Sequence, residues 1–238
     1  MTDTLTEAAT LPAETGEAIP IADQTLDELR LTLAPAIADS AVFDGWGGEA
    51  LIMAAEMEGA DPDVARLAFP GGAMDMIGAW IERIDRDMAR ELPQAKLAEL
   101  KIRERIRTLV QYRLDAVDGQ EEALRSALAI MAMPQNAPRA LRTGWHSADV
   151  MWRLAGDTAT DYNHYTKRAI LASIYGATLA VFVNDETMDK SETRAFLDRR
   201  IDGVMRFEKA KAKFLGGRAD RDRFSVTRCL GRLRYPET

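Results

Sequence analysis

The sequence predicts an all-α fold, and three features point to it. Aromatic residues make up only 7% of the 238 residues, whereas Ala, Leu, Ile and Met, which lose little side-chain freedom in a helix, are plentiful. Apolar residues recur at intervals of three and four along most of the chain, which is the spacing of one helical face. We find no segment with the strict alternation of a half-buried strand and no internal repeat, so we expect about nine helices.

Helix boundaries follow from capping residues and from Gly and Pro, which satisfy or interrupt the hydrogen bonds at helix ends. In the first half of the chain, the predicted elements are a helix over about 25–38, a helix capped by Asp39 or Ser40 that Gly59 ends, a short helix from Asp61-Pro62 to Phe69, and a longer helix over 74–88 that Leu92-Pro93 ends. In the second half, they are an amphipathic stretch over 96–117, a helix over 121–133, a helix from Pro138 to Leu154, a helix that Asp161 caps and that runs to about Asn184, and a last core helix from Ser191.

Charge divides the chain into an acidic beginning and a basic end, with a formal net charge of −7. Arg30 is the only cation in residues 1–65, whereas cations dominate residues 206–238. Residues 1–24 have little apolar area to bury and are expected to form a disordered acidic tail. They show neither a secretory signal nor an Arg-rich transit peptide. No apolar run approaches the length of about 20 residues that a membrane span needs, so any membrane contact is expected to be peripheral.

Small and apolar residues come in a characteristic order between residues 41 and 90, namely Gly45-Trp46, Ala50-Leu51, Ala54-Ala55, Gly59 and Phe69-Pro70-Gly71-Gly72. This order resembles the DNA-binding end of the TetR-type repressors. The resemblance implies a TetR-repressor-like helical bundle, with an N-terminal helix-turn-helix whose turn lies at Gly59.

The segment that would read DNA in such a module has the wrong charge for that task. A reading helix needs Lys and Arg for phosphates and polar side chains for base edges. This segment offers one cation, Arg66, and two carboxylates, Asp61 and Asp63. We therefore expect no nucleic-acid partner and interpret the module as a degenerate packing unit. A TetR-like, ligand-responsive transcriptional regulator is the alternative interpretation.

The sequence lacks the known patterns of catalytic and metal-binding residues. The only histidines are His146 and His164, and the only cysteine is Cys229. No nucleophile elbow and no Glu-x-x-His pair of a carboxylate di-iron bundle occurs. We expect a protein that is not an enzyme and that holds no cofactor and no metal. A hydrolase or hydroxylase in its own right, or an interaction module without a ligand, are the alternatives.

The densest group of polar and aromatic residues surrounds the predicted helix start at Asp161. Asp161, Tyr165 and Arg168 fall at i, i+4 and i+7, on one helical face, with His164 beside them and Trp152 shortly before. An exposed face of Asp, aromatic and Arg side chains is typical of a protein-docking surface. A buried polar junction between helices would have the same composition, and the sequence leaves both interpretations open.

Several motifs in this region and around it occur together in one known family. In chain order they are Asp44-Gly45-Trp46, Phe69-Pro70, Arg103 with Arg107, Pro134-Gln135-Asn136, Met151-Trp152, Ala155-Gly156-Asp157, Thr160-Asp161, Asn163, Tyr165-Thr166-Lys167-Arg168 and Phe196-Leu197-Asp198-Arg199-Arg200-Ile201. Over roughly residues 40–210, the chain resembles the ubiquinone-biosynthesis lipid-binding family, the ninth of the coenzyme Q biosynthesis proteins.

The resemblance implies a non-catalytic accessory protein with a TetR-like fold, usually a homodimer, with a lipid pocket where repressors bind their effector. Such a protein binds isoprenoid lipid, touches the membrane and presents a quinone intermediate to the demethoxyubiquinone hydroxylase. The family's docking face would here hold Asp161, His164, Tyr165 and Arg168, although eukaryotic members carry Trp where His164 lies. Without a transit peptide, the chain looks like a bacterial member that is cytoplasmic and peripheral to the inner membrane.

A polyprenyl tail needs a long apolar cavity with few polar groups. The amphipathic helices around 106–117, 124–133 and 170–182 could line one, and the residues predicted for its wall are Leu109, Tyr112, Ile130, Met131 and Ile174. Each of them would also suit a plain hydrophobic core.

After residue 217, apolar side chains return at helical spacing among arginines, which predicts a short interfacial helix on anionic lipid. A disordered basic tail is the alternative. The residues predicted to contact the membrane are Val226, Arg228, Leu230, Arg232 and Leu233.

The predicted division of the chain is an acidic tail (1–24), a helix-turn-helix module (25–90), a helical lipid-binding and partner-docking domain (91–215) and a basic amphipathic tail (216–238).

Overall fold

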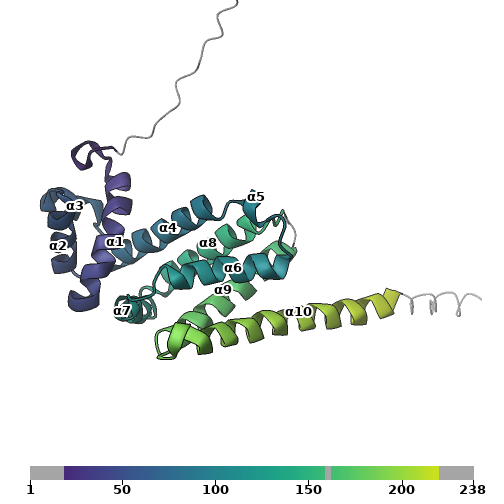
Figure 1. Ribbon diagram of the computed structural model, residues 1–238. Coiled ribbons are helices and arrows are strands. Elements are labelled where there is room, and N and C mark those ends of the chain that lie inside the picture. Colours follow the sequence, from purple (N-terminus) through teal and green to yellow (C-terminus); the bar gives the residue numbers. More distant parts are fainter. Residues whose placement is uncertain (1–18, 159–161, 220–238) are drawn as a thin grey trace, which may run out of the picture.

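The computed structural model describes residues 19–158 and 162–219, and this part of the chain forms helices and contains no strand (Figure 1). The predicted all-α class is confirmed. The helices are α1 (Leu26–Asp44), α2 (Gly48–Glu58), α3 (Pro62–Ala68), α4 (Ala73–Glu91), α5 (Gln94–Leu97), α6 (Ile102–Asp115), α7 (Glu121–Met131), α8 (Ala137–Leu154), α9 (Tyr162–Phe182) and α10 (Ser191–Ala219), with 3-10 turns η1 (Ile21–Asp23) and η2 (Met188–Lys190) before α1 and α10.

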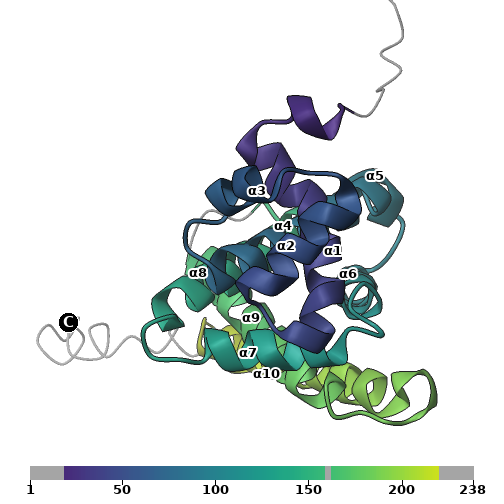
Figure 2. The ribbon, with the colours of Figure 1, turned by 90° about the vertical axis from the view of Figure 1, so that its left-hand side faces the viewer.

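The helices α1, α2 and α3 form a module at one end of the molecule, and the later helices form a larger bundle (Figures 1 and 2). α4 leaves the module and packs against α6, α7 and α8 in the bundle, while α10 lies against α6 and α9. Trp46 joins the two parts. Its Nε1 donates a hydrogen bond to the Ala123 carbonyl at 2.9 Å, and its ring centroid lies 5.2 Å from that of Trp80 on α4.

α1 is longer than the sequence predicts, because it continues past residue 38 to Asp44. The prediction that Asp39 or Ser40 caps the next helix is therefore wrong, since both lie inside α1. Local capping signals are outweighed here by tertiary packing, because the alanine-rich face of this segment is buried against α2 and α4. The helix ends only at Gly45, whose φ of +68° is one that glycine adopts readily.

Pro35 lies inside α1, where proline normally breaks a helix because it has no N–H to donate. The carbonyl left without its helical donor is that of Leu31, four residues earlier. Nη1 of Arg83, on α4, donates to this Leu31 oxygen at 3.2 Å. A side chain of the neighbouring helix thus replaces the missing main-chain hydrogen bond.

The helix-turn-helix elements lie where the sequence predicts them. Gly59 ends α2 in a left-handed conformation with a φ of +74°. Asp61 caps α3, and its side chain accepts from the Asp63 N–H at 2.7 Å. Arg66, the only cation of α3, forms an ion pair with Asp63. Among the exposed side chains of α3 are also the apolar Val64 and Leu67.

The amphipathic stretch predicted over 96–117 is not one helix. It is divided between α5 and α6 by a break at residues 98–101. Arg105 stabilises the break, because its Nη2 donates to the Ala98 carbonyl at 2.7 Å and its Nε to the Leu100 carbonyl at 2.8 Å. Helical spacing alone could not show this break, since the apolar positions continue in phase across it.

Asp185 connects the end of α9 to the start of α10. One carboxylate oxygen accepts from Thr187 N at 3.0 Å and from Thr187 Oγ1, and the other accepts from Thr193 N at 2.7 Å and Thr193 Oγ1 at 2.6 Å. The side chains of Asp185 and Thr193 are buried. Although burial raises the pKa of Asp185, these hydrogen bonds outweigh it and hold the pKa well below its ordinary value.

We expect Asp185→Asn to lower the free energy of unfolding by about 1–2 kcal/mol at pH 7, because an amide nitrogen would replace one acceptor oxygen. A carboxyl whose pKa is depressed in the folded state stabilises it above the unfolded pKa of about 4 and loses that contribution as the pH falls. The difference from the wild type should therefore shrink between pH 5 and about pH 3, as measured by urea unfolding. Glu186→Gln, at an exposed neighbour, is the control. A difference that does not change with pH would contradict this account.

Candidate functional site

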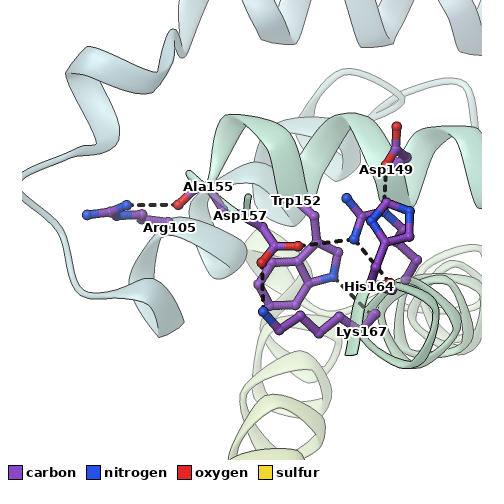
Figure 3. Close-up of polar contacts among 8 residues, drawn as sticks. Arg105, Asp149, Trp152, Ala155, Asp157, His164 and Lys167 are labelled. Carbon is purple, nitrogen blue, oxygen red and sulfur yellow. Dashed lines mark hydrogen bonds and ion pairs between the residues drawn. The ribbon is translucent and has the colours of Figure 1, made fainter. Parts of the chain in front are cut away.

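Arg168 of α9 is the centre of a polar junction between α8 and α9, and its side chain is only 2% exposed. Its Nε donates to Asp149 Oδ1 at 2.5 Å, and its Nη1 donates to Asp157 Oδ2 at 3.0 Å (Figure 3). Nη1 also donates to the His164 carbonyl at 3.1 Å. A buried guanidinium is tolerated only when it is paired and hydrogen-bonded, and these three acceptors meet that condition.

Lys167 and Trp152 extend this junction toward the surface. Nζ of Lys167 donates to Asp157 Oδ1 at 2.6 Å and lies 5.4 Å from the centroid of the Trp152 ring. Trp152 Nε1 in turn donates to the Lys167 carbonyl at 3.0 Å (Figure 3). Asp157 therefore accepts from two consecutive residues of α9, which fixes the turn after α8 against the start of α9.

Arg105 holds the same turn from the opposite side. Its Nη1 donates to the Ala155 carbonyl at 2.8 Å (Figure 3). Gly156 follows with a φ of +88°, and a Cβ there would lie 3.1 Å from Arg105 Nη1. The backbone conformation favours glycine here, and any larger residue would also press on the arginine side chain. This explains why Gly156 lies between Ala155 and Asp157 in the predicted motif.

The outward side of the junction is aromatic. Tyr165 is 62% exposed, and its ring centroid lies 5.2 Å from that of His164 and 6.0 Å from that of Trp145 on α8. Tyr165 is therefore exposed as the predicted docking face requires. That a partner protein binds there stays a prediction.

The prediction that Arg168 shares an exposed face with Tyr165 is wrong. Arg168 is buried because the carboxylates of Asp149 and Asp157 face it from α8 and the following turn. For this residue the structure shows the buried polar junction that the sequence left open. Trp152 is partly buried in the same junction. Asp161, the fifth predicted docking residue, lies outside the described residues.

An apolar cavity of about 510 Å³ lies among α4, α6, α7, α8 and α9. Many of its wall residues are small, and these are Ala127, Ala140, Gly144, Ala169, Ala172, Ser173 and Gly176. Larger wall residues include Trp80, Trp145 and Leu141. Leu141 is 75% exposed, so the cavity reaches the surface beside it. The volume and apolar lining are those of a small-molecule site.

Of the five residues predicted for the lipid wall, only Met131 lines this cavity. Leu109 is fully buried in the core, and Ile130 packs against the core without lining the cavity. Tyr112 lines a shallow polar depression instead. Ile174 lines a separate cavity of about 90 Å³ beside α10. The prediction selected large apolar residues, whereas the cavity exists where side chains are small.

Sequence reasoning missed a polar cluster in the cavity wall. Arg113 forms a buried ion pair with Asp85, and Ser147 Oγ donates to Asp85 Oδ2 at 3.0 Å. Cζ of Arg113 also lies 4.8 Å from the centroid of the Tyr175 ring. Arg113, Ser147 and Tyr175 all line the cavity. Burial raises the pKa of Asp85 above its ordinary value, against the opposing effect of Arg113. The sequence holds one indication of this cluster, because Arg113 occupies a position on the apolar face of its helix.

The predicted membrane-contacting residues cannot be placed on the fold. The predicted membrane residues, Val226, Arg228, Leu230, Arg232 and Leu233, lie outside the described residues. Within residues 19–158 and 162–219, no helix is long and apolar enough to cross a membrane. In the same ranges no three His, Cys, Asp or Glu side chains come together as a metal site would need.

The segment that carries the polar junction and the exposed aromatic surface also carries the similarity to known proteins. Residues 137–208 match the COQ9 family. The chain resembles the COQ9 family, as its motifs predict. The COQ9-like segment comprises α8, α9 and most of α10. It therefore contains every residue of the α8–α9 junction except Arg105.

Named relatives extend the similarity to most of the chain. The mitochondrial ubiquinone biosynthesis protein COQ9 of Rattus norvegicus is 32% identical over 167 residues, covering 68% of this chain and 54% of that protein. The human protein of the same name is 32% identical over 168 residues, covering 68% of this chain and 52% of that protein. The Drosophila melanogaster protein is 27% identical over 187 residues, covering 77% and 57%. The chain spans about half the length of these COQ9 relatives.

A solved structure supports the fold. The crystal structure of a TetR transcriptional regulator from Nitrosomonas europaea superposes with a TM-score of 0.59 at 24% identity, covering 74% of this chain and 97% of that one. The TetR-like architecture predicted from the order of small residues around Gly59 is thereby confirmed. At this identity the likeness concerns the fold alone.

We expect Arg168→Met to lower the free energy of unfolding by about 3 kcal/mol, because it leaves the partly buried carboxylates of Asp149 and Asp157 without the guanidinium between them. Tyr165→Ala should change it by less than about 0.5 kcal/mol, because the ring is exposed. Urea unfolding at neutral pH measures both. A variant of Arg168 that is as stable as the wild type would show that the buried junction is not what fixes α9.

Proposed function

We propose that this protein is a non-catalytic accessory protein of ubiquinone biosynthesis that binds an isoprenoid quinone intermediate and presents it to the demethoxyubiquinone hydroxylase. The observation that carries the proposal is the position of Trp145. Its ring contacts the exposed Tyr165, and the same residue lines the apolar cavity. A ligand site and an exposed aromatic surface therefore meet at α8, inside the COQ9-like segment.

The cavity suits a lipid that is only partly enclosed. Its volume of about 510 Å³ is within the range of about 300–1,000 Å³ for ligand sites, and its walls are largely apolar. A ring and the first part of a polyprenyl chain fit in such a space, and the remainder of the chain leaves beside the exposed Leu141. The relatives are named as ubiquinone biosynthesis proteins, which supports the pathway.

The proposed setting is the surface of a membrane, because the substrate is a membrane lipid. The arginine-rich residues 218–238 would contact anionic headgroups, as the interfacial helix predicted there requires. We further propose that the protein acts as a homodimer, as the TetR-like fold suggests. Its partner docks on the surface around Tyr165, His164 and Trp145, where aromatic side chains can anchor an interface.

Filling the cavity tests the ligand part of the proposal. Gly176 of α9 lines the cavity, and a Cβ there would meet no atom within 4 Å. Gly176→Leu should therefore fit without a backbone clash and occupy ligand space. We expect lipid bound to the purified protein, measured by organic extraction and mass spectrometry, to fall about tenfold, since a steric cost of about 1.4 kcal/mol is sufficient.

Gly203→Leu is the matched control, because Gly203 lies in α10 away from this cavity and a Cβ there also meets no atom within 4 Å. Both substitutions remove a mid-helix glycine, so neither should lower stability. Equal lipid content in the wild type and both variants would refute the cavity as the lipid site. A wild-type protein purified from a ubiquinone-producing host without any lipid would refute lipid binding itself.

Replacing Tyr165 tests the docking part. We expect Tyr165→Ala to weaken binding of the purified demethoxyubiquinone hydroxylase about tenfold in isothermal titration calorimetry, because exposed aromatic residues commonly dominate interface energetics. Phe43→Ala is the control, because Phe43 is 88% exposed on α1, outside the COQ9-like segment. If both variants bind as the wild type does, the hydroxylase docks elsewhere.

A further inference from the structure

The cavity that we propose for the lipid has one feature that a pure hydrocarbon chain does not need. Arg113, which is 1% exposed, lines it and forms an ion pair with Asp85, which does not line it. Replacing a buried ion pair by apolar residues of similar size is often neutral or stabilising. A charged pair at the wall of a largely apolar cavity therefore suits a ligand with a polar group better than it suits a hydrocarbon.

One nitrogen of this cluster is left without a partner. Nε of Arg113 is buried, and no atom of the described residues accepts a hydrogen bond from it. A buried N–H without an acceptor destabilises the folded protein. Tyr175 stands beside the same guanidinium, lines the cavity and is only partly buried. An oxygen atom of a ligand bound against these two residues would be the missing acceptor.

The charge balance of the cluster indicates what kind of oxygen this is. The positive charge of Arg113 is already neutralised by Asp85, whose second oxygen accepts from Ser147. An anionic head group would add a second negative charge beside Asp85 in a water-poor site, which is costly. A carbonyl, hydroxyl or methoxy oxygen would accept the hydrogen bond without that cost.

We infer that Arg113 and Tyr175 bind the head group of the lipid, and that this head group is an uncharged ring bearing oxygen acceptors. The inference rests on the proposed lipid function and assigns an orientation to the ligand. The apolar chain extends along the small residues of α9 toward the opening at Leu141. The head group lies where α6 and α9 present Arg113 and Tyr175, next to the α8 residue Ser147, which donates to Asp85.

Three probes, each a six-membered ring with a ten-carbon chain, separate the contribution of the polar head group from that of the apolar chain. They are decyl-1,4-benzoquinone, phenyldecane and 4-decylbenzoic acid, each titrated into the full-length protein after removal of bound lipid and followed by isothermal titration calorimetry. We expect the quinone to bind about tenfold more tightly than phenyldecane, since a hydrogen bond to a charged donor supplies a difference of this size. The acid should bind more weakly than the quinone.

Variants test whether Arg113 and Tyr175 cause this preference. Arg113→Lys keeps the positive charge beside Asp85 but removes the guanidinium, and Tyr175→Phe keeps the ring but removes the hydroxyl. Both should reduce the preference for the quinone and leave the affinity for phenyldecane unchanged. Tyr112→Phe is the matched control, because Tyr112 does not line this cavity. If Arg113→Lys does not fold, Tyr175→Phe and the comparison of the three probes on the wild type still test the head-group assignment.

The outcomes distinguish this inference from the proposed function. Equal affinities for the quinone and phenyldecane, or tighter binding of the acid, would overturn the head-group assignment and leave lipid binding intact. A quinone preference that survives in both variants would also overturn it. If none of the three probes binds, the cavity is not a lipid site, and the proposed function fails with the inference. A preference that is lost in both variants and kept in Tyr112→Phe supports it.

Discussion

The guanidinium of Arg168 lies between the carboxylates of Asp149 and Asp157, and the placement of α9 depends on this arrangement. Charged groups can be held in the interior only with full hydrogen bonding, so the junction permits few alternative positions of the two helices. Lys167 and Arg105 add bonds to the same turn from two sides. The exposed Tyr165 and the α9 wall of the cavity are both positioned by this fixed crossing.

The cavity and the junction use different kinds of side chain on the same two helices. Where α8 and α9 meet at the junction, long charged side chains fill the space between them. Where they line the cavity, α9 presents Ala169, Ala172 and Gly176, and the space stays open. Close packing in protein interiors normally removes such voids. Small side chains on α9, several of them exposed, leave this space unfilled, while the junction fixes the crossing of the same two helices.

The sequence predicted what depends on local chemistry and on motif order. Gly59 and the cap at Asp61 were correctly placed because turns and caps are set by neighbouring residues. The family resemblance and the fold followed from the order of motifs. The burial of Arg168 could not be predicted, because spacing shows which residues share a face and not which face another helix covers. The cavity wall was missed for a related reason, since Leu109 is as apolar as a wall residue but has neighbours on every side.

Pro35 and Arg83 have a consequence for how the molecule can move. The Leu31 carbonyl on α1 receives its hydrogen bond from a side chain of α4, so separating α1 from α4 would break this bond. The Trp46 bond to Ala123 imposes a similar cost between the start of α2 and α7. These two bonds, with the packing of α1 against α4, hold the helix-turn-helix module on the bundle. A rotation of this module against the bundle, of the kind by which a ligand-responsive regulator transmits an allosteric signal, would have to break these bonds.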